Sequence, residues 1–127
     1  MFKSNSSFLV LYTHSISITL NFFKAIGADI KQAESEKVAI KIEGHEIHFV
    51  LDMSEPFEEY KYIAKNNDYG NGVIFYVEVD SIEEIYKLIL PAGGKLKSEI
   101  FDNDWNAKEL LFEDPNGYKF AFYQMYS

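Results

Sequence analysis

The chain has 127 residues, of which 47% are hydrophobic and 17% aromatic, enough apolar material for one folded domain and too much for a disordered chain. It contains no cysteine, which excludes disulfides and thiolate metal sites. The formal net charge is -8 and the lysines are scattered, so we expect no nucleic-acid partner.

The N-terminal segment has one short apolar run, Phe8 to Tyr12. A secretory signal or a membrane span needs a longer run, so we expect a cytoplasmic protein without a membrane partner. An acidic surface attracts cationic ligands, although it is also an ordinary means of keeping a protein soluble.

The first half predicts one strand, one helix and three further strands. The run from Phe8 to Tyr12 is typical of a buried strand. Apolar residues then recur at helical spacing from Ile16 to Ile26, before Gly27. Three strands follow, at residues 28–33, 37–42 and 45–51.

The same order of elements restarts after a polar linker that contains a short helix at residues 58–64 and a turn-rich stretch at 66–72. Strict alternation from Val73 to Val79 predicts a strand, and Ser81 caps a helix that ends near Pro91. The remaining elements are strands at residues 95–100, 108–113 and 118–124, a loop at 101–107 and a turn at 114–117.

Strand, helix and three strands therefore occur twice, which predicts an α+β fold made of two βαβββ modules. We expect one domain of residues 1–127, with module one at about 6–52, a linker at 53–71 and module two at about 72–124.

The order and spacing of several short motifs resemble those of the glyoxalase, bleomycin resistance protein and extradiol dioxygenase superfamily, also called the vicinal oxygen chelate superfamily. The motifs are the strand 72–80, the Asp-Pro-Asn-Gly-Tyr turn at 114–118 and the Asn-Phe-Phe-Lys-Ala-Ile-Gly helix end at 21–27. The resemblance implies a curved, eight-stranded mixed sheet that encloses a cleft and is often completed in a dimer. We therefore expect a homodimer. A second chain could pair with the long sheet edge, and the high aromatic content suits an interface.

The superfamily usually holds a divalent metal with His, Glu or Gln side chains on its first, fourth, fifth and eighth strands. In this chain those positions fall on Ser6, Ser7 or Phe8 in the first strand, and then on His48, Ile74 and Ala121. Only His48 is a competent ligand, and one imidazole cannot hold a metal. The resemblance thus implies that the usual metal site is absent or displaced, and we expect no metal and no cofactor.

Alternation within the strands assigns side chains to the cleft without reference to the family. The apolar rows of the strands at 45–51, 73–79 and 118–124 are expected to face the core. The opposite rows then place five candidate ligand-binding residues at the cleft. Trp105, in the loop before the strand at 108–113, is the sixth candidate, although alternation does not give the direction of a loop residue. The six candidates are His48, Tyr76, Trp105, Tyr123, Glu46 and Glu78.

Each candidate also has an ordinary interpretation. His48 is a hydrogen-bonded, half-buried histidine, a ligand contact or a metal ligand. Trp105 is either a cleft wall or a dimer contact, and Glu46 and Glu78 are either solvated charges or part of an acid–base pair. His14 and His45 receive no role.

The leading interpretation is a metal-independent protein that binds a small aromatic or cationic molecule, similar to the antibiotic-sequestering members of the superfamily. The alternative is a lyase, isomerase or dioxygenase that uses a displaced metal site. A third possibility is a structural or regulatory dimer without a ligand. Metal content distinguishes the first two, and a sizeable aromatic cleft distinguishes both from the third.

Overall fold

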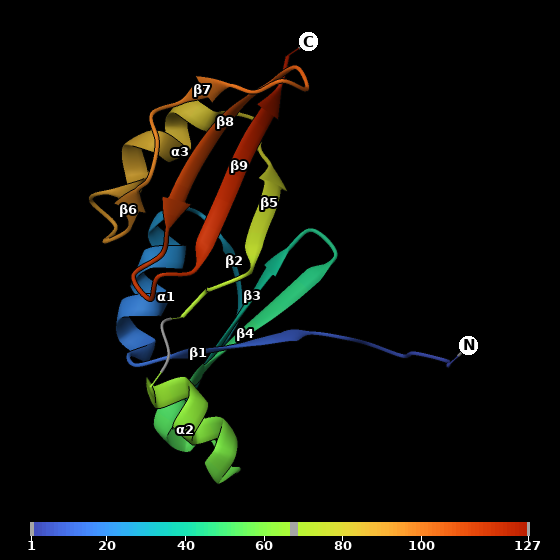
Figure 1. Ribbon diagram of the computed structural model, residues 1–127, viewed down its shortest axis with the longest axis vertical. Coiled ribbons are helices and arrows are strands. Elements are labelled where there is room, and N and C mark those ends of the chain that lie inside the picture. The colour runs from blue at the N-terminus through green and yellow to red at the C-terminus, as the bar shows by residue number, and fades with distance from the viewer. Residues whose placement is uncertain (1, 67–68, 127) are drawn as a thin grey trace. The chain divides into compact units, whose positions relative to one another are not determined.

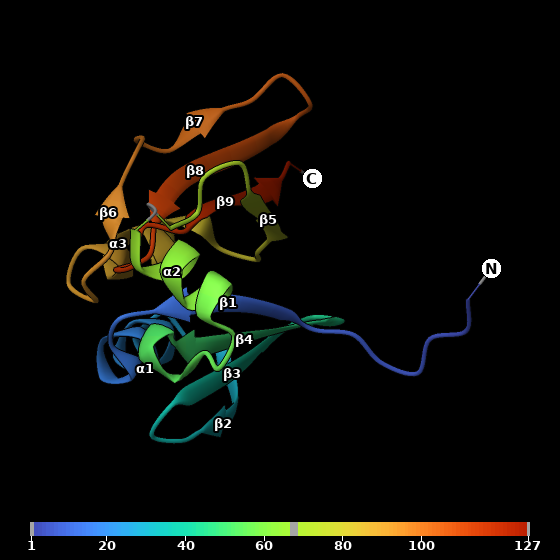
Figure 2. The same ribbon diagram turned by 60° about the horizontal axis from the view of Figure 1, so that its bottom comes forward.

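The computed structural model describes residues 2–66 and 69–126. The chain divides into two compact units, Met1–Asn66 and Asn67–Ser127, and each unit is built around its own sheet (Figures 1 and 2). The α+β class is confirmed, and unit one follows the predicted βαβββ order. Unit two has one strand more after its helix, so the expected eight-stranded sheet is approximate, and the strands form a four-stranded and a five-stranded sheet. The organisation as a single domain stays a prediction, and residues 67 and 68 of the expected turn-rich stretch lie outside the described residues.

Unit one contains a four-stranded sheet with the order β1-β4-β3-β2, in which β1 runs parallel to β4 and the other neighbours are antiparallel. Its elements are β1 (Leu9–Thr13), α1 (Ile16–Ala25), β2 (Asp29–Ala33), β3 (Lys37–Ile42), β4 (His45–Leu51), the 3-10 helix η1 (Asp52–Ser54) and α2 (Glu58–Asn66).

The core of unit one lies between α1 and one face of this sheet. Ser15 caps the helix, because its Oγ accepts a hydrogen bond from the Ile18 backbone N–H at 3.3 Å. Phe22 and Phe23 on α1 are fully buried, and the Phe23 ring lies 5.0 Å from the ring of Phe49 on β4. Burying one such ring contributes roughly 1.5–3 kcal/mol, so these aromatic contacts hold the helix on the sheet.

Strand β1 is less buried than the sequence predicts. Leu9 and Val10 are 42% and 43% exposed, and only Leu11 and Thr13 are buried. The reason is that β1 is the first strand in the order of its sheet, with β4 as its only strand partner in unit one. A continuous apolar run predicts burial on both faces, and this edge strand does not have it.

Unit two contains a five-stranded sheet in which β5, β9, β8 and β6 follow one another and β7 also pairs with β8. Strand β5 is parallel to β9, and the other pairs are antiparallel. The elements are β5 (Ile74–Glu78), α3 (Ile82–Ile89), β6 (Lys95–Leu96), β7 (Phe101–Asp102), β8 (Ala107–Glu113) and β9 (Lys119–Met125).

The core of unit two is an aromatic layer beneath α3. The Phe112 ring lies 5.4 Å from that of Phe120 and 4.9 Å from that of Phe122. Ile82 and Ile89 on α3 are fully buried. The helix begins as predicted, with the Glu84 backbone N–H donating to Ser81 Oγ at 3.4 Å.

The strand predicted at residues 95–100 is wrong in its extent. It ends at Leu96, and a separate short strand, β7, begins at Phe101 within the segment expected to be a loop. The cause lies at Ser98, whose side-chain Oγ accepts the hydrogen bond of the Leu111 backbone N–H at 3.0 Å. A hydroxyl here replaces a backbone carbonyl in the ladder, so the regular pairing with β8 stops and resumes further along.

The turn between β8 and β9 forms as predicted and packs against the segment that leads into β5. Gly70 has a φ of +85°, and a Cβ there would lie 2.7 Å from the carbonyl oxygen of Gly117 and 2.9 Å from Tyr118 Cα. Gly72 has a similar φ of +82° with open space around it. Both positions favour glycine, but only the first also lacks room for a side chain.

These two glycines form a matched pair for a stability test. We expect Gly72→Ala to lower the free energy of unfolding by about 1 kcal/mol through the positive φ alone. Gly70→Ala should lower it by roughly 1–3 kcal/mol more, because backbone atoms of the turn must move. Urea unfolding of both variants measures the difference, and equal effects would show that the close approach does not restrain this segment.

Within the described residues, no helix is long and apolar enough to cross a membrane.

Candidate functional site

The face of the unit-one sheet opposite α1 carries the first pair of predicted site residues, Glu46 and His48 on β4. His48 is 8% exposed, and its Nε2 lies 2.7 Å from Glu46 Oε1. Because an ionised carboxylate only accepts hydrogen bonds, the imidazole donates here. The structure thus brings into contact two residues that alternation places on one face.

The ring of Phe8 covers the imidazole of His48. The two rings are stacked with their centroids 4.0 Å apart and their planes 13° from parallel. Phe8 is itself 56% exposed, and Val10, the parallel-strand partner of His48, is 43% exposed. The surface around His48 is therefore aromatic and aliphatic.

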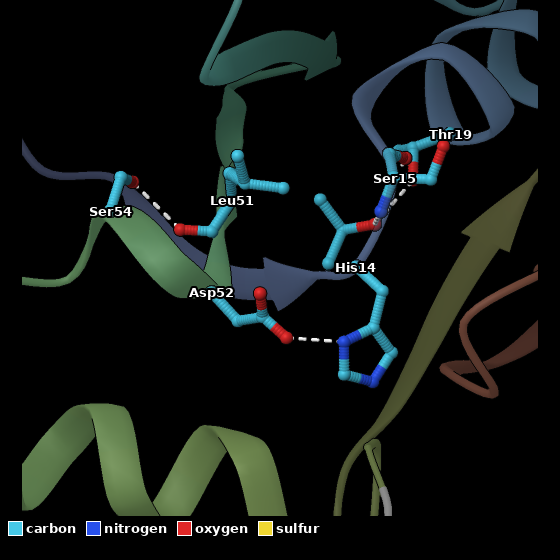
Figure 3. Close-up of polar contacts among 7 residues, drawn as sticks. His14, Ser15, Thr19, Leu51, Asp52 and Ser54 are labelled. Carbon is cyan, nitrogen blue, oxygen red and sulfur yellow. Dashed lines mark hydrogen bonds and ion pairs between the residues drawn. The ribbon is translucent and has the colours of Figure 1, made fainter.

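A second histidine contact lies where β1 and β4 end. The ring of His14 points to the carboxylate of Asp52, and its Nδ1 contacts Asp52 Oδ2 (Figure 3). Asp52 is 3% exposed, so the imidazole is a polar partner for a buried carboxylate. Nearby, Ser54 Oγ donates to the carbonyl oxygen of Leu51 at 2.7 Å, which closes η1 (Figure 3).

A further hydrogen bond joins β1 to Glu55, the residue that follows η1. The hydroxyl of Tyr12 donates to Glu55 Oε2 at 2.8 Å. Burial raises the pKa of Tyr12 to about 12, and the hydrogen bond to Glu55 and the charge of Glu55 act in the same direction. Tyr12 therefore stays protonated at neutral pH and supports the structure at this end of the sheet.

The face of the unit-two sheet opposite α3 carries the other four predicted residues, and we call it the aromatic face. It is defined by Tyr76 on β5, Tyr123 on β9, Phe101 on β7 and Trp105 in the β7–β8 turn. Tyr76 is 57% exposed and Trp105 44%. The Trp105 ring packs edge-on against Tyr123 with the centroids 4.8 Å apart.

The strand register confirms that the predicted residues of β5 and β9 share this face. Tyr76 is the Cα partner of Ala121, and Glu78 is the partner of Tyr123. Ile74 is 51% exposed and Ala121 is fully buried. The aromatic rings of this face can contact flat or positively charged molecules, and its aliphatic side chains can contact hydrocarbon.

Sequence reasoning missed Phe101 of the aromatic face, and it also missed Glu109, which lies on the same side of the sheet. Glu109 is 5% exposed, it is the Cα partner of both Tyr123 and Phe101, and its Oε1 accepts a hydrogen bond from Asn103 Nδ2 at 2.9 Å. Asn103 also accepts the backbone N–H of Trp105 at 3.1 Å, so one side chain holds both Trp105 and Glu109. The only sequence signal was a carboxylate next to the apolar run Leu110 to Phe112.

The six predicted residues thus fall into two groups, one in each unit. Unit one brings Glu46 and His48 into direct contact. Unit two brings Trp105 and Tyr123 into ring contact and places Tyr76 and Glu78 on the same face as Tyr123.

The side chains at the expected metal positions do not fit a metal ion. His48 donates to Glu46 and is stacked under Phe8, which has no ligand atom. Ile74 and Ala121 offer hydrocarbon only. Across residues 2–66 and 69–126, no group of three or more His, Cys, Asp and Glu side chains is arranged to hold a metal ion.

Family comparison identifies the fold. The model of the Glyoxalase/Bleomycin resistance protein/Dioxygenase superfamily matches residues 7–122. The chain belongs to this superfamily. Comparison with curated proteins gives no significant match.

Solved structures similar to this superfamily member include the hypothetical protein SA1046 from S. aureus, with a TM-score of 0.79 and 19% identity over 97% of this chain and 95% of that one. A glyoxalase-related enzyme from Fulvimarina pelagi has a TM-score of 0.78 and 12% identity over 96% and 88% of the two chains. A glyoxalase/bleomycin resistance protein/dioxygenase family enzyme from Burkholderia phytofirmans PsJN has a TM-score of 0.76 and 16% identity over 94% and 98%. At these identities the likeness concerns the fold.

Proposed function

We propose that this superfamily member binds a small organic molecule without a metal ion, and that the aromatic face of unit two is its main contact surface. The observation that carries the proposal is that hydrocarbon side chains stand at two positions where metal-coordinating side chains are usual. Ile74 and Ala121 stand where the superfamily usually has metal ligands. Tyr76 is exposed, lies on the same face of β5 as Ile74, and is the Cα partner of Ala121 on β9. Such a surface favours binding through aromatic and apolar contact.

His48 and Glu46 in unit one are the second part of the proposal. Their hydrogen bond gives unit one a polar group within an apolar surface, the combination by which binding sites orient ligands. No specific observation on the described residues supports the alternative, an enzyme that uses a displaced metal site.

A thermal-shift screen of small organic compounds in the presence of a chelator tests the proposal. A ligand at 100 times its Kd should stabilise the protein by about 2.7 kcal/mol. We expect Tyr76→Ala to weaken binding of the compounds found by about tenfold, because a ring contact of this kind contributes roughly 1 kcal/mol or more. His48→Ala tests unit one separately and should weaken the binding of compounds that contact the surface around His48.

Matched controls come from exposed residues of the same types. Tyr62 on α2 is 68% exposed, and His45 at the start of β4 is exposed. Tyr62→Ala and His45→Ala should leave the affinity unchanged. If Tyr76→Ala and His48→Ala also leave it unchanged, the ligand binds elsewhere and the site assignment is wrong.

We also propose that the chain forms a homodimer. In support, β5 is an edge strand of the unit-two sheet and pairs with β9 on one side. Unit one in addition exposes large apolar side chains at and before the start of α2, namely Met53, Phe57 and Tyr60. Free sheet edges and aromatic patches are common at homodimer interfaces, and sedimentation velocity at micromolar concentration measures the state.

A further inference from the structure

One row of the aromatic face alternates acidic and aromatic side chains across four neighbouring strands. Its members are successive Cα partners, in the order Glu78 on β5, Tyr123 on β9, Glu109 on β8 and Phe101 on β7. Neighbouring strands lie about 4.8 Å apart, so each carboxylate is beside an aromatic ring. Trp105 joins the row through its contact with Tyr123.

Glu109 is the unusual member of this row because it is buried. It is 5% exposed, and its Oε1 has one partner, the neutral amide of Asn103. Within the described residues, no hydrogen bond or ion pair engages its other oxygen, Oε2. Because no buried side-chain oxygen of these residues lacks a hydrogen-bond partner, Oε2 is open to solvent and thus to a ligand on the aromatic face.

No described side chain of unit two supplies a cation to Glu109. The chain has no arginine, and the described lysines of unit two near the row have other contacts. Lys108 lies 2.8 Å from Glu83 on the α3 side of the sheet, Lys97 lies 3.7 Å from Glu113, and Lys119 donates to the carbonyl oxygen of Gly70 at 3.5 Å.

We propose that Glu109 binds the positively charged nitrogen of an organic ligand, an amidinium, guanidinium or ammonium group. Its Oε2 accepts a charge-assisted hydrogen bond from that group, and the rings of Trp105 and Tyr123 contact the cation and the carbon skeleton beside it. Glu78, exposed at the other end of the row, and the net charge of -8 attract such a ligand to the surface. This inference rests on the proposed function and deepens it by naming the class of ligand.

Benzamidine and benzamide provide the test, because they have nearly the same shape and differ in charge. The full chain is titrated with each compound, and the fluorescence of Trp105, the only tryptophan, reports binding at the aromatic face. We expect benzamidine to bind about tenfold more tightly than benzamide, or better, because a buried charge-assisted hydrogen bond contributes more than a neutral one. No benzamidine binding at millimolar concentration, or equal binding of both compounds, would overturn the inference.

Glu109→Gln isolates the charge, since glutamine keeps the oxygen that accepts from Asn103. This variant should lose the preference for benzamidine while it retains the wild-type affinity for benzamide. The matched control is Glu113→Gln, on the same strand and the same face, which should change the benzamidine affinity by less than about threefold. Equal losses in the two variants would show a general effect of surface charge and overturn the assignment.

Thermal unfolding of the unliganded variants gives a readout that does not depend on binding. Glu109→Gln should leave the melting temperature nearly unchanged, because glutamine keeps the oxygen that accepts from Asn103 and Oε2 has no partner among the described residues to lose. A marked fall would show that Glu109 stabilises the fold and would overturn a ligand-binding role. If neutral aromatic compounds bind in a manner that depends on Tyr76 but not on Glu109, the proposed function stands and this inference fails.

Discussion

Phe49→Ala is expected to lower the free energy of unfolding by about 3–5 kcal/mol, because it removes a fully buried ring from the core of unit one. The ring lies against Phe23 of α1, so its loss also removes a contact that holds the helix on the sheet. A typical small domain has only 5–15 kcal/mol of stability, so this one change would remove a large fraction of it.

Chemical denaturation of Phe49→Ala measures the effect, and Phe2→Ala is the control. Phe2 is 85% exposed, so its truncation should cost less than about 1 kcal/mol. A loss below about 1 kcal/mol in Phe49→Ala would contradict a core centred on α1 and β4.

The second large effect is a dependence of stability on pH that originates at Asp114. This residue is 1% exposed, and its Oδ1 accepts hydrogen bonds from the backbone N–H groups of Asn116 at 3.0 Å and Tyr118 at 2.8 Å. Burial raises the pKa of Asp114 to about 6, against the opposing effect of hydrogen bonds from Asn116 and Tyr118. The turn between β8 and β9 therefore contains an acid that folding makes easier to protonate.

The direction of the pH dependence follows from this upward shift. Between the ordinary pKa of 3.8 and the folded value of about 6, the folded state binds the proton more readily than the unfolded state. The stability due to protonated Asp114 is complete below pH 4 and is lost as the pH rises through 6. Two units of pKa correspond to about 3 kcal/mol.

Asp114→Asn removes the titration and keeps an oxygen for the two backbone N–H groups. The stability of the wild type relative to this variant should fall by about 3 kcal/mol from pH 4 to pH 7, because every other titrating group is common to both proteins. Urea unfolding across this pH range measures the difference. A difference that stays constant with pH, or that rises, would show that burial does not raise this pKa.

Alternation in the sequence predicted much of the fold and part of the site. The strands from His45 to Leu51 and from Ile74 to Glu78 have one apolar row each, so the faces of His48 and Tyr76 followed from the period of two. The turn at residues 114–117 was equally clear, because its residue types suit only a tight reversal.

Glu109 was not predictable in this way. Lys108 and Glu109 are both polar, Leu110 and Leu111 are both apolar, and no alternation marks which of them faces the helix. The register with β9 decides it, since Glu109 pairs with Tyr123 and Leu110 pairs with Phe122 of the core. Such pairing depends on contacts between distant segments.

Two other differences have local causes that a pattern of residue types does not show. The side chain of Ser98 accepts a ladder hydrogen bond and splits the expected strand into β6 and β7. The apolar run at β1 resembles a buried strand, but an edge strand with one partner leaves Leu9 and Val10 exposed. Hydrophobicity predicts that a strand forms, and its place in the sheet decides how much is buried.

The most direct test of metal-independent binding is one titration combined with elemental analysis. The purified protein is analysed for bound metals, treated with a chelator and titrated with a compound found in the ligand screen. We predict well below one metal ion per chain and the same affinity before and after chelation. About one transition-metal ion per chain, whose removal abolishes binding and whose return restores it, would contradict the proposal.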